Sequence, residues 1–315
     1  MEQKRAFPIP VNYFSIALGL LSLGLAWRSA AVLLGMPGIY GELILAVGGV
    51  SWTGFFLVYI YKWVYRRESA QLELHDIIQC CFISLLPITT ILMGLAFLPY
   101  ASLLAAGFIA AGILGAMFFA AYRSGGLWRG THVFEATTPV VYLPAVASSF
   151  AGASALGALG LFDWGLLFFG AGVFSWLSLE AAVLQRLRTG MALPPPLRGV
   201  IGIQLAPPFV GCAAYLAVNG GQADLLVKCL LGYGFLNFIF LVRILPWILE
   251  KGFAVSLWAF SFGLGSMAAV GVKLQAGGGT FVSLGNILFW LGSFLIAGLF
   301  LATIRMVLQG RFFVK

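Results

Sequence analysis

Charged residues are scarce in this chain, and histidine and cysteine are scarcer still. Only 9% of the 315 residues are charged, whereas 61% are hydrophobic; a soluble domain carries roughly 25% charged residues. Two histidines and four cysteines form no CxxC or other zinc-ligand spacing, and they are too few for a disulfide framework. This composition excludes a soluble domain, and a mean hydropathy of +1.02 indicates an integral membrane protein.

Signatures of enzyme chemistry are also missing. The sequence holds no phosphate-binding loop and no nucleophile elbow. His75 and His132 fall in polar connections, where a solvated charged loop is the simpler interpretation. The neighbouring thiols Cys80 and Cys81 could bind a soft metalloid, but cysteine is also an ordinary buried residue. We therefore predict no catalytic residue, no cofactor and no metal site.

Long apolar runs fill almost the whole chain. A membrane-spanning helix needs roughly 20 apolar residues, and runs of this length predict an all-α membrane protein with a single transmembrane domain, 1–315. The ten predicted spans are 11–33, 41–63, 77–98, 101–122, 137–158, 164–185, 199–218, 225–247, 253–273 and 282–304.

The basic residues indicate the orientation of these spans. All but three of the 18 lysines and arginines lie at the termini or in the connections that follow even spans; the exceptions are Arg28, Lys228 and Lys273. Because basic residues are enriched in cytoplasmic loops, both termini are predicted to be cytoplasmic. An even number of spans requires the same arrangement. The net charge of +8 is thereby explained without a nucleic-acid partner.

Proline alternates along the chain. It marks the odd spans and is nearly absent from the even ones, and the residues that we expect to bend helices are Pro10, Pro87, Pro144, Pro207 and Pro208. Membranes tolerate a bent helix where neighbours cover the opened backbone. We therefore predict five helical hairpins, with the odd helices in an inner ring around a pore and the even helices outside. This two-helix period favours hairpins over two inverted halves of five spans.

The centres of the odd spans lack Asp, Glu, Lys and Arg, so a pore among them would hold no fixed charge to trap an ion. Aromatic rings recur there among small residues, which allow close helix packing. The candidate pore-lining residues are Phe14, Ser15, Phe82, Phe150, Phe209, Phe262 and Gly263. Two charges within even spans, Glu180 and Arg243, are predicted to pair between hairpins.

Four stretches in odd spans carry a family resemblance: PIPVNYFSIALG (8–19), ATTPVVYLPAVASSFAG (136–152), IQLAPPFVG (203–211) and LWAFSFGLG (257–265). They resemble the tellurite-resistance and dicarboxylate transporter family, which is related to plant guard-cell slow anion channels. The resemblance implies ten helices in five hairpins, with five inner helices around a pore and five outside. It also implies a homotrimer with one pore per protomer and a phenylalanine gate in the ninth helix at Phe262. That span lacks proline, so its bend would depend on Gly263, Gly265 or Gly271.

These features together predict an anion channel or channel-like transporter of the bacterial inner membrane, gated by Phe262 and linked by family to tellurite resistance. Its partners would be small inorganic anions, with dicarboxylates or tellurite as further candidates. One alternative is a proton-coupled dicarboxylate carrier or efflux pump, which needs a titratable group in the path. Another is a membrane enzyme or scaffold in tellurite detoxification, which would depend on Cys80 or Cys81.

Overall fold

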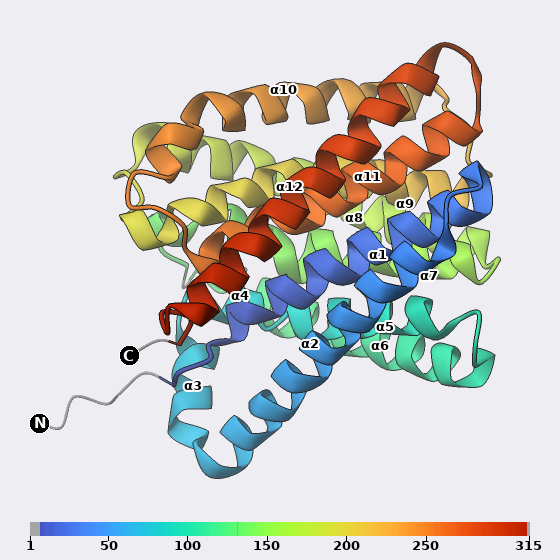
Figure 1. Ribbon diagram of the computed structural model, residues 1–315. Helices are drawn as coiled ribbons and strands as arrows, with labels where there is room; N and C mark the ends of the chain where they lie inside the picture. Colours follow the sequence, from blue (N-terminus) through green and yellow to red (C-terminus); the bar gives the residue numbers. More distant parts are fainter. Residues whose placement is uncertain (1–6, 131, 314–315) are drawn as a thin grey trace, which may run out of the picture.

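The computed structural model describes residues 7–130 and 132–313, and this part of the chain is helical, without a β-strand (Figure 1). Ten of its helical segments are long and apolar enough to cross a membrane, as predicted. These spans are Val11–Leu34, Gly38–Tyr65, Gln79–Phe97, Ser102–Leu127, Pro139–Ala158, Phe162–Thr189, Pro195–Val218, Leu225–Ile248, Val255–Ala276 and Gly279–Leu308.

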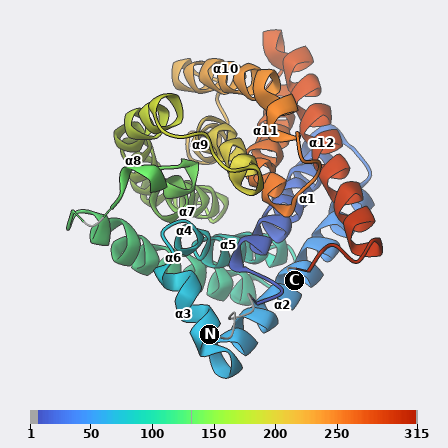
Figure 2. The same cartoon turned by 90° about the vertical axis from the view of Figure 1, so that its left-hand side faces the viewer.

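Odd and even spans differ in burial. Between 61% and 83% of the most apolar window is buried in the odd spans, against 17% to 33% in the even ones. The odd spans contain α1 (Phe14–Leu34), α5 (Leu85–Phe97), α7 (Ser148–Ala158), α9 (Ala206–Val218) and α11 (Ser261–Ala276). The even spans contain α2 (Gly38–Tyr65), α6 (Ser102–Leu127), α8 (Phe162–Thr189), α10 (Leu225–Ile248) and α12 (Val282–Leu308), which lie at the periphery in Figure 2.

Helix contacts follow the same alternation. Each even helix packs against the odd helix that precedes it in the chain. Among the odd helices, α1 contacts both α5 and α11, α9 contacts both α7 and α11, and α5 contacts α7. The two ends of the described chain lie at the same end of the bundle (Figure 1), where the Tyr13 hydroxyl donates to the Phe312 carbonyl at 2.5 Å. We call this the terminal end and the opposite one the far end.

Every odd span begins at the terminal end with a segment separate from its main α-helix. These segments are η1 (Val11–Tyr13), α4 (Gln79–Phe82), η3 (Pro139–Val141) with the π-helical η4 (Leu143–Ala147), η5 (Pro195–Leu205) and η6 (Val255–Phe260). The predicted prolines lie at or near these junctions: Pro10 precedes η1, Pro87 is third in α5, Pro144 lies in η4, and Pro207 and Pro208 are second and third in α9. A proline in a first turn removes an N–H that has no helical partner.

The ninth span also consists of a separate first segment followed by an α-helix, but it contains no proline. Its 3₁₀ segment η6 ends at Phe260 and α11 begins at Ser261, so the change in helix type precedes Gly263, Gly265 and Gly271. These glycines allow close packing instead. A Cβ atom at Gly265 would lie 1.8 Å from Ser22 Oγ in α1, and one at Gly271 would lie 2.5 Å from the Gly285 carbonyl oxygen in α12. Small residues thus bring α11 close to both neighbours.

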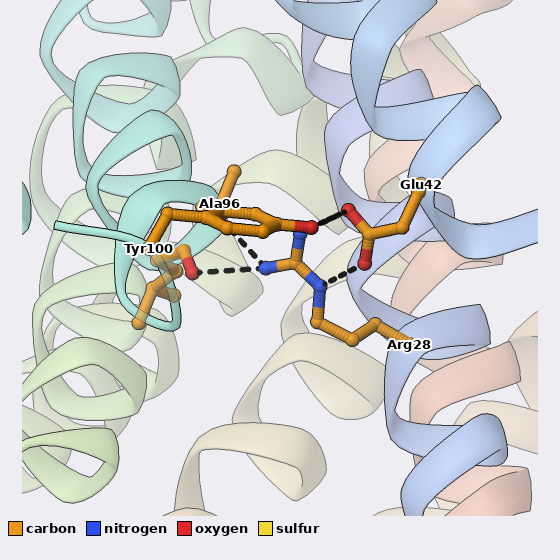
Figure 3. A network of polar contacts seen from close by, with 5 residues as sticks. Arg28, Glu42, Ala96 and Tyr100 are labelled. Carbon is orange, nitrogen blue, oxygen red and sulfur yellow. Dashed lines mark hydrogen bonds and ion pairs between the residues drawn. The ribbon is translucent and has the colours of Figure 1, made fainter. Parts of the chain in front are cut away.

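An ion pair between α1 and α2 forms the centre of a polar cluster that also reaches α5 (Figure 3). The Arg28 guanidinium of α1 donates to both carboxylate oxygens of Glu42 in α2, at 2.7 and 2.6 Å. It also donates at 2.8 Å to the Ala96 carbonyl at the end of α5, and the Tyr100 hydroxyl donates to Glu42 at 2.7 Å. That hydrogen bond raises the pKa of Tyr100. The cluster fixes α1 and α2 against α5.

We predict that Arg28→Met lowers the free energy of unfolding by about 1–2 kcal/mol, because Glu42 and the Ala96 carbonyl lose a charged donor and Glu42 remains partly exposed. The measurement is the thermal unfolding midpoint of detergent-purified protein. Arg243→Met serves as the control, since Arg243 is exposed on α10. Equal midpoints for the two variants would contradict a structural role of the cluster.

Candidate functional site

The odd spans enclose a cavity of about 590 Å³ in the far half of the bundle. All five contribute to its wall, while no even helix does within the described chain. Exposed residues form its rim at the helix ends, among them Leu33, Gly221 and Ala276. The wall is mostly aliphatic and small, with the hydroxyls of Ser22, Ser29, Ser154 and Ser266.

The inner end of the cavity is formed by the residue that each wall helix places nearest the terminal end. These are Ser22, Leu92, Ala151, Val210 and Phe262. Phe262 has the largest side chain of the five and is only 6% exposed. It is the second residue of α11. The preceding Ser261 donates to the Ser15 carbonyl at 3.0 Å, and this bond helps to hold the ring in place.

The terminal half of the odd spans is filled with side chains. Tyr142, Phe150 and Trp258 are at most 1% exposed, and Trp258 Nε1 donates at 2.8 Å to Thr303 Oγ1 of α12. A cavity bordered by η4, α7, η5 and α9 measures about 10 Å³, which is at the lower limit for one water molecule. Among the described residues of these four elements, the space beyond the 590 Å³ cavity is therefore closely packed.

The other predicted pore-lining residues do not border this cavity. Three of the phenylalanines pack against outer helices instead: Phe14 on Phe55 of α2, Phe150 on Phe169 of α8, and Phe209 on Phe235 of α10. Glycines in the outer helices make room for two of them, since a Cβ at Gly172 or Gly234 would lie 2.6 or 3.0 Å from the Phe150 or Phe209 ring.

The remaining candidates are buried in contacts between elements. Phe82 is buried within α4. Ser15 Oγ donates to the Asn12 carbonyl at 2.7 Å, and a Cβ at Gly263 would lie 2.9 Å from Leu205. In these candidates, the pattern of an aromatic ring beside small residues corresponds to packing between helices. Among the predicted phenylalanines, only Phe262 borders the cavity.

Glu180 lies outside the cavity wall and has three hydrogen-bond donors. Its Oε2 accepts from the Tyr142 hydroxyl at 2.6 Å and from Trp176 Nε1 at 2.8 Å, and its Oε1 accepts from the Tyr233 hydroxyl. These donors come from η4, α8 and α10. The hydrogen bonds agree with the predicted structural role of Glu180, because they link α8 to two other spans through Tyr142 and Tyr233. The predicted pairing is wrong for Arg243, which is exposed on α10 and has no hydrogen bond or ion pair with a described residue.

The candidate metal ligands stay apart. The structure contains no group of three or more His, Cys, Asp or Glu side chains able to hold a metal ion within residues 7–130 and 132–313. Cys80 and Cys81 are both buried free thiols. His75 is exposed on α3 (Arg67–His75), and His132 Nε2 lies 2.9 Å from Thr137 Oγ1.

One residue of the cavity escaped prediction. Lys273 lies in the last turn of α11 and is the only charged side chain among the described residues that border the cavity. A signal was present in the sequence, because Lys273 is one of three basic residues outside the terminal-end regions and lies eleven positions after Phe262. Both residues belong to one face of a helix.

Comparison with known proteins gives one family for nearly the whole chain. Residues 8–304 match the SLAC1 family model, described as voltage-dependent anion channel. The tellurite resistance protein TehA homolog of Haemophilus influenzae is 41% identical over all of this chain and 96% of its own length. The S-type anion channels SLAH2 and SLAH3 of Arabidopsis thaliana are 23% and 24% identical over 84% of this chain, which spans 52% and 42% of their lengths. The chain therefore belongs to the SLAC1 family of membrane anion channels and transporters.

Proposed function

We propose that this protein is an anion channel or channel-like transporter whose pore runs between the five odd helices and is closed by Phe262. One observation carries the proposal: a cavity extends from the far end to the Phe262 ring, and the described residues that line it belong to these five helices and the turns that follow α9 and α11. A large apolar side chain at a constriction excludes ions, since an ion that loses water there gains no polar partner. The filled terminal half is the expected appearance of the closed state.

The proposed pore suits anions. Its wall holds no Asp or Glu among the described residues, and it has a single cationic side chain. The segments that start each odd span put the positive ends of helix dipoles at the terminal end. Small inorganic anions are the proposed permeant class, and dicarboxylates and tellurite are competitors to be compared with them.

The proposed setting is the bacterial inner membrane, with both termini in the cytoplasm. The basic residues of the terminal end support this orientation, as cytoplasmic segments are enriched in lysine and arginine. A homotrimer with one pore in each protomer is proposed from the family resemblance. The cavity requires no residue from a second copy, because one chain supplies all five wall helices.

Replacing Phe262 with Ala is expected to open the pore, because a ring at the inner end of the cavity is removed while the wall helices stay. Anion current in planar bilayers should rise roughly tenfold or more above wild type. Phe209→Ala is the matched control, since it removes the same ring from a buried site against α10. Wild-type current from correctly inserted Phe262→Ala protein would refute the gate.

The opened variant is expected to conduct iodide and nitrate best, then bromide, then chloride. A wall without strong fixed charges replaces hydration poorly, so permeability should follow the ease of losing water. Reversal potentials in bi-ionic solutions of Phe262→Ala protein measure this order. The reverse order would indicate a strongly binding site in the path instead.

Glu180→Gln is expected to leave anion flux through the Phe262→Ala variant independent of an imposed pH gradient, as in the parent. The carboxylate lies outside the cavity wall and is occupied by three donors. Flux into proteoliposomes with and without a pH gradient separates a channel from a proton-coupled carrier. Gradient-driven uptake that disappears on Glu180→Gln would support the carrier.

A further inference from the structure

The face of α11 that borders the cavity is continuous from the inner end to the rim. It comprises Phe262, Gly265, Ser266, Ala269, Lys273 and Ala276. Apart from the adjacent pair Gly265 and Ser266, successive members are three or four residues apart, which places them on one side of a helix. Lys273 follows Phe262 by eleven residues, which corresponds to about 16 Å along the axis. The cationic side chain therefore stands near the rim, on the same wall as the Phe262 ring at the inner end.

Lys273 has no hydrogen bond or ion pair with the part of the chain that is described. The other two basic residues near the far end, Arg28 and Lys228, differ from Lys273. Arg28 is paired with Glu42, and Lys228 stands 5.9 Å from the centre of the Phe281 ring, outside the cavity wall. A partly buried ammonium group without an acidic partner is costly unless an anion or water supplies its partners. Lys273 thus presents an unneutralised charge to the cavity.

The helix ends around Lys273 carry partial negative charge, which a cation at this position offsets. The odd helices run parallel, so the C-terminal ends of α7, α9 and α11 all reach the rim. Each helix end carries a partial negative charge of about half an elementary unit. An anion that enters from this side meets repulsion from these ends, and Lys273 is the wall residue that offsets it. Asp224, at the same end, is occupied by the Tyr215 hydroxyl and the Val227 N–H.

Deeper in the cavity, two hydroxyls lack partners. Ser266 of α11 and Ser154 of α7 border the cavity and form no hydrogen bond with another described residue. Ser22 and Ser29, by contrast, donate to carbonyls of their own helix. A free hydroxyl can donate to an anion and replace a water molecule of its hydration shell. Ser266 lies one helical turn from Phe262 on the same helix face.

We propose that Lys273 forms a binding site for a small inorganic anion in the outer part of the cavity, and that the Ser266 and Ser154 hydroxyls receive the anion before it reaches Phe262. The proposal rests on the proposed function, in that this cavity is the anion path. It adds a specific side chain that concentrates anions at the far end, since a cation in a low-dielectric cleft raises the local anion concentration.

Cysteine modification tests the charge without any need for conduction. In protein with the exposed Cys229 replaced by Ser, Ala269→Cys places a thiol on the cavity wall one turn from Lys273. The anionic sulfonatoethyl and cationic trimethylammonioethyl methanethiosulfonates are then compared by their second-order rates. Both react with the same thiolate, so their ratio removes any effect of Lys273 on the reactivity of the thiol itself.

Lys273→Gln is expected to lower the anionic-to-cationic rate ratio by roughly tenfold, as expected for one charge at close range in a partly shielded site. Lys273→Arg should retain the ratio, which separates the charge from a structural role of the side chain. Lys228→Gln removes a cation outside the cavity and should leave the ratio unchanged. An unchanged ratio in Lys273→Gln, or an equal fall in Lys228→Gln, would overturn the proposal.

Conduction gives the second measurement. In the Phe262→Ala background, Lys273→Gln should raise the half-saturating chloride concentration on the far side several-fold, whereas Lys228→Gln should not. An unaltered half-saturating concentration would refute the binding site in the conduction path. If Phe262→Ala protein carries no current while the modification ratio still depends on Lys273, the gate fails and the anion-attracting charge stands.

Discussion

The structure depends on one constraint: a helix that departs from α geometry inside a membrane must have its freed backbone groups covered by protein. Each odd span has such a departure in its terminal half, from the short η1 to the eleven-residue η5. Lipid cannot supply hydrogen bonds to these groups. The five even helices supply the covering layer, which explains why they are long, regular and largely exposed while the odd spans are buried.

The same constraint explains why the odd helices have little amphipathic character. Their outward faces meet another helix and their inward faces meet small or apolar neighbours, so residues are apolar all round. Polar groups gather instead at specific contacts between helices. Glu180 connects three elements, and Arg28 connects α1 and α2 to the end of α5. Both clusters satisfy a buried or half-buried charge with several donors or acceptors.

Hydropathy was sufficient to predict ten spans, and proline spacing was sufficient to predict which spans are buried, because each rests on a property that accumulates over many residues. The direction of individual side chains was not predictable in this way. Phe14, Phe150 and Phe209 occupy the same sequence context as Phe262, yet their rings contact α2, α8 and α10. In a helix that is apolar on every face, periodicity gives no signal for which face borders the cavity. Lys273 was overlooked because one charge at a span end resembles an interfacial anchor.

The unequal halves of the proposed pore have an electrical consequence. The far half holds a cavity of about 590 Å³, whereas the terminal half is filled by side chains. The electrical potential inside a cavity that is open to the solution at the far end stays close to the potential of that solution. The membrane voltage therefore falls mainly across the filled half. Moving one elementary charge through 100 mV corresponds to about 2.3 kcal/mol. Nearly all of that work would then be done within the thickness of protein between Phe262 and the terminal end, where the field is strongest.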